Sequence, residues 1–244
     1  MLPVLQIGPF SAQTSGLILL AGLWLGLTLS ERFARGSQRE VEALGNLLFY
    51  SLLAALIGAR LGYALRFPAA FVESPASLLS LNPGLLDAWF AGTAALVFGL
   101  IYGQRQGLKF WPTLDAITPA LAALLLAIAL GNLASGRAYG LPSDLLWAIE
   151  LWGASRHPSQ IYEALAAAAI LLLTIQAARQ ADIRAGLVFV LFVALAAGAR
   201  LFLDAFRGEG LLLPNGWRAA QVAAWLILGA CLWGYGWLSQ RDGE

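Results

Sequence analysis

Arginine-rich groups of polar residues stand inside otherwise apolar sequence, and they are the residues best suited to chemistry. Arg200, Asp204 and Arg207 follow one another at spacings of four and three, which would place them on one stripe of a helix. A planar guanidinium can bind a phosphate through two parallel hydrogen bonds. The stripe is therefore either a grip for an anionic head group or a charge pair, Arg200 with Asp204, that ties helices together.

A second polar group is expected to open a helix after Pro158. Arg156, Gln160 and Glu163 again lie four and three residues apart, and His157, the one histidine of the chain, stands beside Arg156. Proline is favoured in the first turn of a helix, which supports a helix start at this point. His157 is either a structural residue or a general base.

Two further elements carry one polar residue each. Arg60 lies between Gly58 and Gly62, where it either extends toward the membrane interface or joins the two groups in one cavity. Asn132 follows Gly131 at the expected end of a helix, where it either caps the helix or contacts a ligand. Arginines collected beside amides and a carboxylate favour an anionic phospholipid as the ligand.

The elements that must position these residues are apolar helices. The chain has 244 residues, of which 59% are apolar and only 12% charged, too few charges to cover a soluble protein. Strand-like alternation is absent, and a membrane-spanning helix needs about 20 apolar residues. Seven long stretches contain no Asp, Glu, Lys or Arg: 1–30, 43–59, 88–104, 116–136, 164–178, 185–199 and 219–240. We therefore predict an all-α polytopic membrane protein with seven transmembrane helices, the first of them within 1–30.

Composition excludes several other classes of protein. Lys and Arg total 15 against 14 Asp and Glu, so no basic field attracts nucleic acid. A single Cys excludes an intrachain disulfide, and a single His argues against a multi-histidine metal site. Eight Lys or Arg fall on one set of connections and five on the other, which favours an N-out/C-in orientation. We expect one integral membrane domain over 1–244, with outer-face loops at 66–87 and 132–160.

Taken in their order along the chain, the polar elements resemble those of the prolipoprotein diacylglyceryl transferase family. The most specific piece is RHPSQIYE at 156–163, which looks like the family signature RHPSQ-[LI]-YE. Residues 58–63 are similar to its GGRLGY element, and 200–207 resemble R-x-x-x-E-x-x-R with Asp204 in place of Glu. Gly131 and Asn132, followed by Gly136 and Gly140, resemble GRxGNFxNGExxG, and the resemblance covers roughly 7–235. Phe90 and Ala129 stand where the family has the His of a His-Gly-Gly element and an Arg.

The resemblance implies an enzyme of lipoprotein biosynthesis in the bacterial inner (plasma) membrane, with its site facing the outer leaflet. Its substrates would be phosphatidylglycerol and the thiol of a lipobox cysteine in a prolipoprotein, which receives the diacylglyceryl group. No metal and no organic cofactor are expected. On this resemblance we assign catalysis to Arg200, Asp204 and His157, and substrate binding to Arg60, Asn132, Arg156, Gln160, Glu163 and Arg207. The alternatives are a weakened family member that binds phospholipid or lipoprotein without turnover, and a membrane scaffold or transporter.

Overall fold

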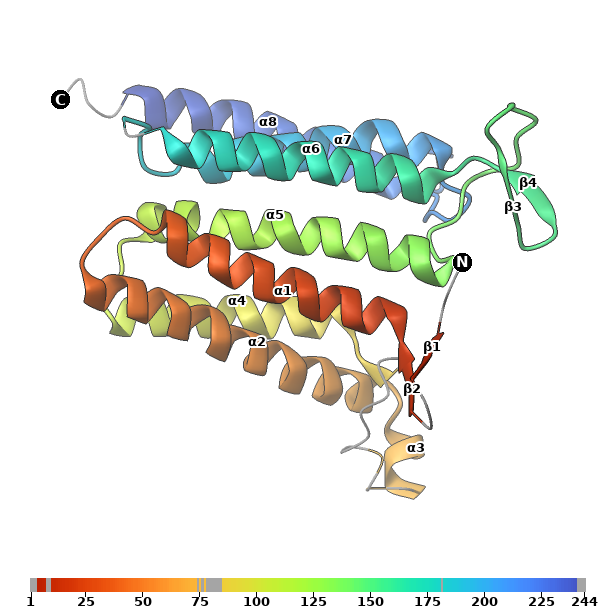
Figure 1. Ribbon diagram of the computed structural model, residues 1–244, viewed down its shortest axis with the longest axis horizontal. Helices are drawn as coiled ribbons and strands as arrows, with labels where there is room; N and C mark the ends of the chain where they lie inside the picture. Colours follow the sequence, from red (N-terminus) through yellow and green to blue (C-terminus); the bar gives the residue numbers. More distant parts are fainter. Residues whose placement is uncertain are drawn as a thin grey trace. The chain divides into compact units, whose positions relative to one another are not determined.

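Seven long helices make up most of the protein (Figure 1). The computed structural model describes residues 4–7, 10–73, 75, 77, 85–180 and 182–240. The long helices are α1 Thr14–Phe33, α2 Gln38–Arg66, α4 Ala88–Arg105, α5 Phe110–Ser135, α6 Ser159–Arg179, α7 Leu187–Leu203 and α8 Ala219–Gln240. A short helix, α3 Pro68–Glu73, follows α2, and a 3-10 turn, η3 Asp204–Phe206, follows α7.

The long helices fall on the charge-free stretches of the sequence. Among the described residues, six of them are long and apolar enough to cross a membrane: α1, α2, α5, α6, α8, and α7 together with η3. The seventh, α4, has 18 residues and ends in Gln104 and Arg105, so it is not among these six. The chain is therefore an all-α polytopic membrane protein, as predicted. The crossing by α4 and the N-out/C-in orientation stay predictions.

The expectation of one helix within residues 1–30 is wrong in its first part. Residues Val4–Ile7 form β1, which pairs antiparallel with β2, Phe10–Gln13. The helix begins only at Thr14. Two prolines in this part of the sequence, Pro3 and Pro9, disfavour an earlier helix start because proline lacks a backbone donor.

A second hairpin lies within the predicted loop 132–160. Strand β3, Ile149–Leu151, pairs antiparallel with β4, Ala154–Arg156. The turn between them uses Trp152 and Gly153, with φ of 55° and 73°, the left-handed conformation that two-residue hairpins favour. The expected helix end at Gly131 and Asn132 is also wrong, because α5 continues to Ser135.

The chain forms two compact units. The smaller unit is Ala34–Thr113, which holds α2, α3 and α4. The larger unit holds the described residues up to Phe33 and those from Leu114 onward. One integral membrane domain over 1–244 stays a prediction, as do the outer-face positions of the loops. Part of the loop at 66–87 (residues 74, 76 and 78–84) lies outside the described residues.

In the larger unit, small residues allow α1 to pack directly on α5. A Cβ atom at Gly22 would overlap the side chain of Ala127, and one at Gly26 would lie 3.0 Å from the Cα of Ala120. Deeper in the same unit, a buried cluster of Ala122, Ala123 and Leu171 packs against partly buried apolar side chains of α1, α5, α6 and α7. This packing fixes the helices whose ends carry the polar residues.

In the smaller unit, α2 and α4 pack through glycines of α2. A Cβ at Gly58 would overlap the side chain of Ala94, and one at Gly62 would overlap the ring of Phe90. The ring of Phe90 therefore covers Gly62 directly. The lack of a side chain at these two glycines thus allows α2 and α4 to pack closely.

Candidate functional site

The polar residues of the larger unit gather where its helix ends meet. Helices α5 and α7 end, and α6 and α8 begin, at the same end of this unit, because α5, α6, α7 and α8 alternate in direction (Figure 1). Asn132 lies near the end of α5, Glu163 near the start of α6 and Arg200 in the last turn of α7. The antiparallel order thus brings together residues that are far apart in the sequence.

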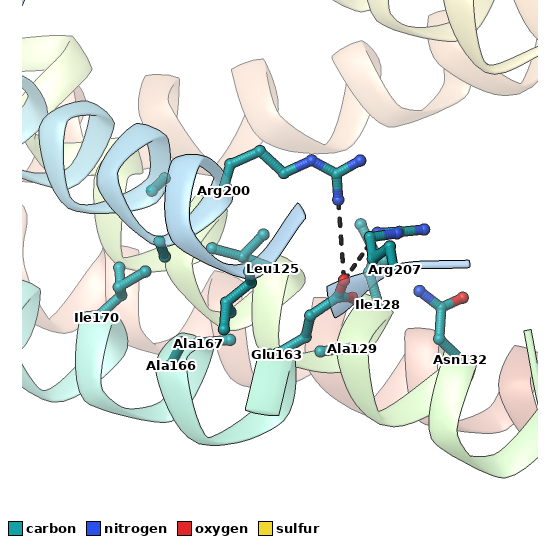
Figure 2. A pocket seen from close by; sticks show the side chains of 13 residues that line it. Leu125, Ile128, Ala129, Asn132, Glu163, Ala166, Ala167, Ile170, Arg200 and Arg207 are labelled. Carbon is teal, nitrogen blue, oxygen red and sulfur yellow. Dashed lines mark hydrogen bonds and ion pairs between the residues drawn. The ribbon is translucent and has the colours of Figure 1, made fainter. Parts of the chain in front are cut away.

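Glu163 contacts two arginines at this end of the unit. Its Oε1 atom lies 2.8 Å from Nη1 of Arg207 and 3.8 Å from Nη1 of Arg200. Figure 2 shows both guanidinium groups directed at this carboxylate, with Asn132 beside Arg207. The shorter contact is a charge-assisted hydrogen bond, while the longer one leaves Arg200 less constrained. The side chain of Arg200 is 44% exposed, against 15% for Arg207.

A second carboxylate, that of Asp204 directly after α7, forms an ion pair with Arg200. Its Oδ1 atom lies 3.4 Å from Nη2 of Arg200, and its Oδ2 atom lies 3.7 Å from Nη1 of Arg218. The Asp204 side chain is only 1% exposed. A carboxylate this deeply buried requires positive partners. The three guanidiniums of Arg200, Arg207 and Arg218 therefore meet two carboxylates, which leaves one excess positive charge.

A cavity of about 150 Å³ adjoins this charge cluster. Most of its wall is apolar and comes from α5, α6 and α7; the lining residues are Leu125, Ile128, Ala129, Asn132, Glu163, Ala166, Ala167, Ile170, Ala196, Ala199, Arg200, Leu203 and Arg207. The polar residues of the wall lie together at one end (Figure 2). A hydrocarbon wall with guanidinium donors at one end suits an amphiphile with an anionic head group.

The predicted stripe of Arg200, Asp204 and Arg207 on one helix is wrong in its geometry. Helix α7 ends at Leu203, η3 tightens the next turn, and Arg207 follows in an extended conformation with φ −78° and ψ 136°. The turn still leaves Arg200 and Asp204 as an ion pair, and it directs Arg207 to Glu163. Both arginines line the cavity, although they are not on one helical face.

Arg156 does not share a helical stripe with Gln160 and Glu163, because it lies in β4, before α6 begins. Its Nε atom donates to the Leu151 carbonyl at 3.1 Å, and its Nη1 atom donates to the Gly140 carbonyl at 3.2 Å. Its guanidinium also lies 4.8 Å from the centre of the Tyr139 ring. Arg156 thus holds the hairpin to the preceding loop and is not among the residues that line the cavity.

The rest of the RHPSQ segment joins the start of α6 to the loop before the hairpin. The Ser159 hydroxyl donates to the Ala138 carbonyl at 2.8 Å, and Gln160 Nε2 donates to the Arg137 carbonyl at 3.1 Å. Both side chains are fully buried. The helix begins at Ser159 with Pro158 as its cap residue, as predicted. Gln160 therefore positions backbone and does not line the cavity.

His157 packs among aromatic rings. Its ring centre lies 5.3 Å from that of Phe206 and 6.4 Å from that of Tyr162. Among the described residues, its buried Nδ1 atom has no hydrogen-bond partner, and His157 does not line the cavity. A Cβ at Gly140 would overlap the His157 carbonyl oxygen, so this position requires a glycine.

Arg60 lies in the smaller unit, where its Nη1 atom donates to the Leu85 carbonyl at 3.0 Å. In the same unit, Arg66 pairs with Asp87 at 2.7 Å, and Asp87 caps the start of α4 through the backbone N–H groups of Trp89 and Phe90. These contacts close the chain between α2 and α4. The role of Arg60 in substrate binding stays a prediction.

Arg218 is the member of the charge cluster that sequence reasoning missed. It counted only as one of the cations of the outer connections, because no periodic spacing links it to Asp204. Gln221, in the first turn of α8, donates from Nε2 to the Leu201 carbonyl at 3.2 Å. A basic residue directly before a helix, as Arg218 is, gives only a weak indication of a functional role in the sequence. The fold is what brings Arg218 to the buried carboxylate of Asp204.

The fold and the site together define an integral membrane protein with an arginine-lined amphipathic cavity. The family model for prolipoprotein diacylglyceryl transferase matches residues 3–237, and the chain belongs to this family. The chain is 32% identical over 179 residues to the phosphatidylglycerol–prolipoprotein diacylglyceryl transferase of Methylococcus capsulatus, covering 70% of this chain and 68% of that protein.

Two further relatives carry the same name. The protein of Synechococcus elongatus is 26% identical over 253 aligned residues, which cover 96% of this chain and 86% of that protein. The protein of Aromatoleum aromaticum is 34% identical over 167 residues, which cover 65% of this chain and 63% of that protein. The predicted family is thus confirmed over nearly the whole chain, and nothing in these similarities favours a scaffold or a transporter.

Proposed function

We propose that this protein transfers the diacylglyceryl group of phosphatidylglycerol to the thiol of a lipobox cysteine in a prolipoprotein. The observation that carries the proposal is a cluster of three guanidiniums around two carboxylates, of which Arg200, Arg207 and Glu163 line the polar end of an apolar cavity. Membership of the transferase family supports it, as do the names of the relatives.

The reaction makes one bond and breaks one. The cysteine sulfur attacks the glyceryl carbon that carries the phosphate, so that a C–S bond forms and the C–O bond to the phosphate breaks. Glycerol phosphate leaves with the electron pair, and the thiol proton must be taken up by a base or by water. Negative charge on the leaving phosphate grows during the reaction, and fixed donors in a water-poor site stabilise such charge most effectively.

Arg200 and Arg207 are the donors we assign to the phosphate, with Asn132 beside them as an uncharged hydrogen-bonding group. Arg200 is the more exposed of the two arginines and has the longer contacts, 3.4 and 3.8 Å, to its carboxylates. Its guanidinium can therefore turn toward an incoming anion at small cost. A guanidinium next to the acceptor thiol also favours the thiolate, which is the nucleophilic form.

Glu163 is better placed than His157 to act near the reacting atoms. Glu163 lines the cavity, whereas the His157 ring packs on Phe206 and Tyr162 away from the cavity wall. Asp204 is buried beneath Arg200. We assign Asp204 the task of holding Arg200, and Glu163 that of orienting both arginines and contacting the acceptor.

The acceptor thiol comes from another polypeptide. The one cysteine of this chain, Cys231, is buried in α8. It lies roughly three helical turns beyond Ala219, where α8 leaves the cluster. We further propose that the site faces the outer leaflet of the bacterial inner membrane, because the positive-inside rule puts the connections that precede α6 and α8 outside.

A direct assay tests the proposal. Purified protein is given phosphatidylglycerol and a lipobox peptide, and the thioether product is sought by mass. We expect product from the wild type, none from Arg200→Ala, and wild-type yield from Arg179→Ala, an exposed arginine at the opposite end of α6. Absence of product with retained phosphatidylglycerol binding would support a weakened family member instead. A wild type that neither forms product nor binds phosphatidylglycerol would support the scaffold alternative.

A further inference from the structure

Arg218 stands outside the residues assigned to the reaction so far. We propose that Arg218 is a positioning residue: by pairing with Asp204 it leaves Arg200 available to the anionic head group and gives the cluster its excess positive charge. The inference rests on the proposed function, in which Arg200 binds phosphatidylglycerol.

The contacts of Arg218 lie in the connection between α7 and α8. Its Nη1 atom donates to the carbonyl oxygens of Asp204 at 2.8 Å and of Arg207 at 3.1 Å. The same atom lies 3.7 Å from Oδ2 of Asp204. The side chain is 21% exposed, so it is held within the protein and is less open to an incoming ligand than Arg200.

The Asp204 carboxylate depends on these two arginines. Within the part of the chain that the structure describes, neither of its oxygens accepts a hydrogen bond. Oδ1 faces Arg200 and Oδ2 faces Arg218, one guanidinium for each oxygen. A buried carboxylate that loses one of two charge partners binds the remaining one more strongly. Without Arg218, Asp204 would therefore draw Arg200 away from the cavity.

The charges of the cluster lead to the same conclusion. Arg200, Arg207 and Arg218 against Glu163 and Asp204 give one net positive charge, three minus two. Phosphatidylglycerol carries one negative charge, whereas phosphatidylcholine is neutral overall. Removal of Arg218 makes the cluster neutral, and removal of the Asp204 charge as well restores the excess.

The test measures lipid binding without turnover. Wild type, Arg218→Gln, Asp204→Asn and the double variant are purified, and binding of phosphatidylglycerol and of phosphatidylcholine with the same acyl chains is compared by native mass spectrometry. We expect Arg218→Gln to lower the preference for phosphatidylglycerol about tenfold. The double variant should recover at least about threefold of that loss, because its cluster regains the excess positive charge although Asp204 no longer holds Arg200. Arg179→Gln, at an exposed arginine of the same unit and at the opposite end of α6, serves as the control.

Two results would overturn the inference. One is an unchanged preference in Arg218→Gln. The other is a double variant as poor as Arg218→Gln, because Arg218 would then act only through the carbonyl groups that it binds. If Arg218→Gln does not fold, Arg218→Lys keeps the charge and must retain the preference within about threefold.

Turnover adds an independent measurement. If the protein is a transferase, Arg218→Gln raises KM for phosphatidylglycerol about tenfold and lowers kcat much less, since the effect is on binding of the anion. A wild type that makes no thioether, yet shows the lipid preference and its rescue in the double variant, would disprove the transferase proposal and leave the role of Arg218 standing.

Discussion

Two buried aspartates in this protein are paired with arginine in different ways. In the smaller unit, Asp87 accepts hydrogen bonds from the N–H groups of Trp89 and Phe90 at 2.9 and 3.2 Å, and it pairs with Arg66 at 2.7 Å. In the larger unit, the contacts of the Asp204 carboxylate with other described residues are ion pairs without hydrogen bonds, at 3.4 and 3.7 Å. The side chains are 3% and 1% exposed, so burial does not distinguish them.

The difference separates a structural pair from a binding site. Asp87 is satisfied by its own helix start and by one arginine, so that one carboxylate pairs with one guanidinium. Asp204 and Glu163 share three arginines, and the contacts of Arg200 are long enough to be exchanged for those of a ligand. An excess of guanidinium over carboxylate, with loose contacts, is what an anion site requires.

The loosely paired group consists of Glu163 and Asp204 with their three arginines. In this group the largest expected effect follows from Glu163→Gln. The substitution removes the charge that orients Arg200 and Arg207, so we expect turnover to fall about 100-fold while phosphatidylglycerol still binds. Glu150→Gln, at an exposed acid of β3, is the matched control. Thioether formation is measured by mass, and turnover of Glu163→Gln within threefold of wild type would remove Glu163 from the site.

A backbone contact beside this group can be broken at Gly140. Gly140→Ala places a methyl group against the His157 carbonyl, which must shift the loop that Arg156 and Gln160 hold. We expect turnover to fall about tenfold with a lower thermal midpoint. Gly229→Ala in α8, where a Cβ meets nothing within 4 Å, should change neither. Normal turnover in Gly140→Ala would show that this loop does not position the site.

In the tightly paired group, which consists of Asp87 and Arg66, we expect substitutions to lower stability instead. Asp87→Ala removes the cap of α4 and should lower the free energy of unfolding by about 1–2 kcal/mol. Arg66→Ala should cost less than about 1 kcal/mol, because the Arg66 side chain is 58% exposed. Thermal melting in detergent measures both, with the exposed Asp144→Ala as the reference. Activity per folded molecule should stay within about twofold of wild type. An activity loss without a stability loss would contradict the contrast between the two groups.

The smallest expected effect is that of salt. Arg200 is 44% exposed, so salt screens its attraction for an anionic head group. Raising ionic strength from about 0.05 to about 0.5 M should raise KM for phosphatidylglycerol about twofold. Steady-state kinetics with substrate dilution held constant check this. A KM independent of salt would indicate that apolar contacts alone determine binding.

Charge-free stretches predicted the helices well because the membrane leaves the chain few alternatives to helix. The sequence signature at 156–163 identified the family. The ion pair of Arg200 with Asp204 was one of the two alternatives that their spacing left open. The start at Thr14 was missed, since residues 4–13 are as free of charge as residues 14–30, which form most of the helix that follows.

The site itself was predicted only in part. Asn132, Glu163, Arg200 and Arg207 do meet at one cavity. Arg156, in contrast, binds backbone carbonyls, because a hairpin that a spacing argument cannot reveal precedes α6. Arg218 was missed for a similar reason. No helical spacing relates it to its partner Asp204, and the two become neighbours only through the turn at η3.

Photocrosslinking tests the central claim most directly. Phosphatidylglycerol with a photoreactive group on its glycerol head is bound to the wild-type protein, irradiated, and located by peptide mass mapping. The account predicts label on the segment of Arg200 to Arg207, displaced by unlabelled phosphatidylglycerol but not by phosphatidylcholine. Label confined to the smaller unit, or label displaced equally by both lipids, would contradict the claim that the excess arginines of the larger unit bind the anionic head group.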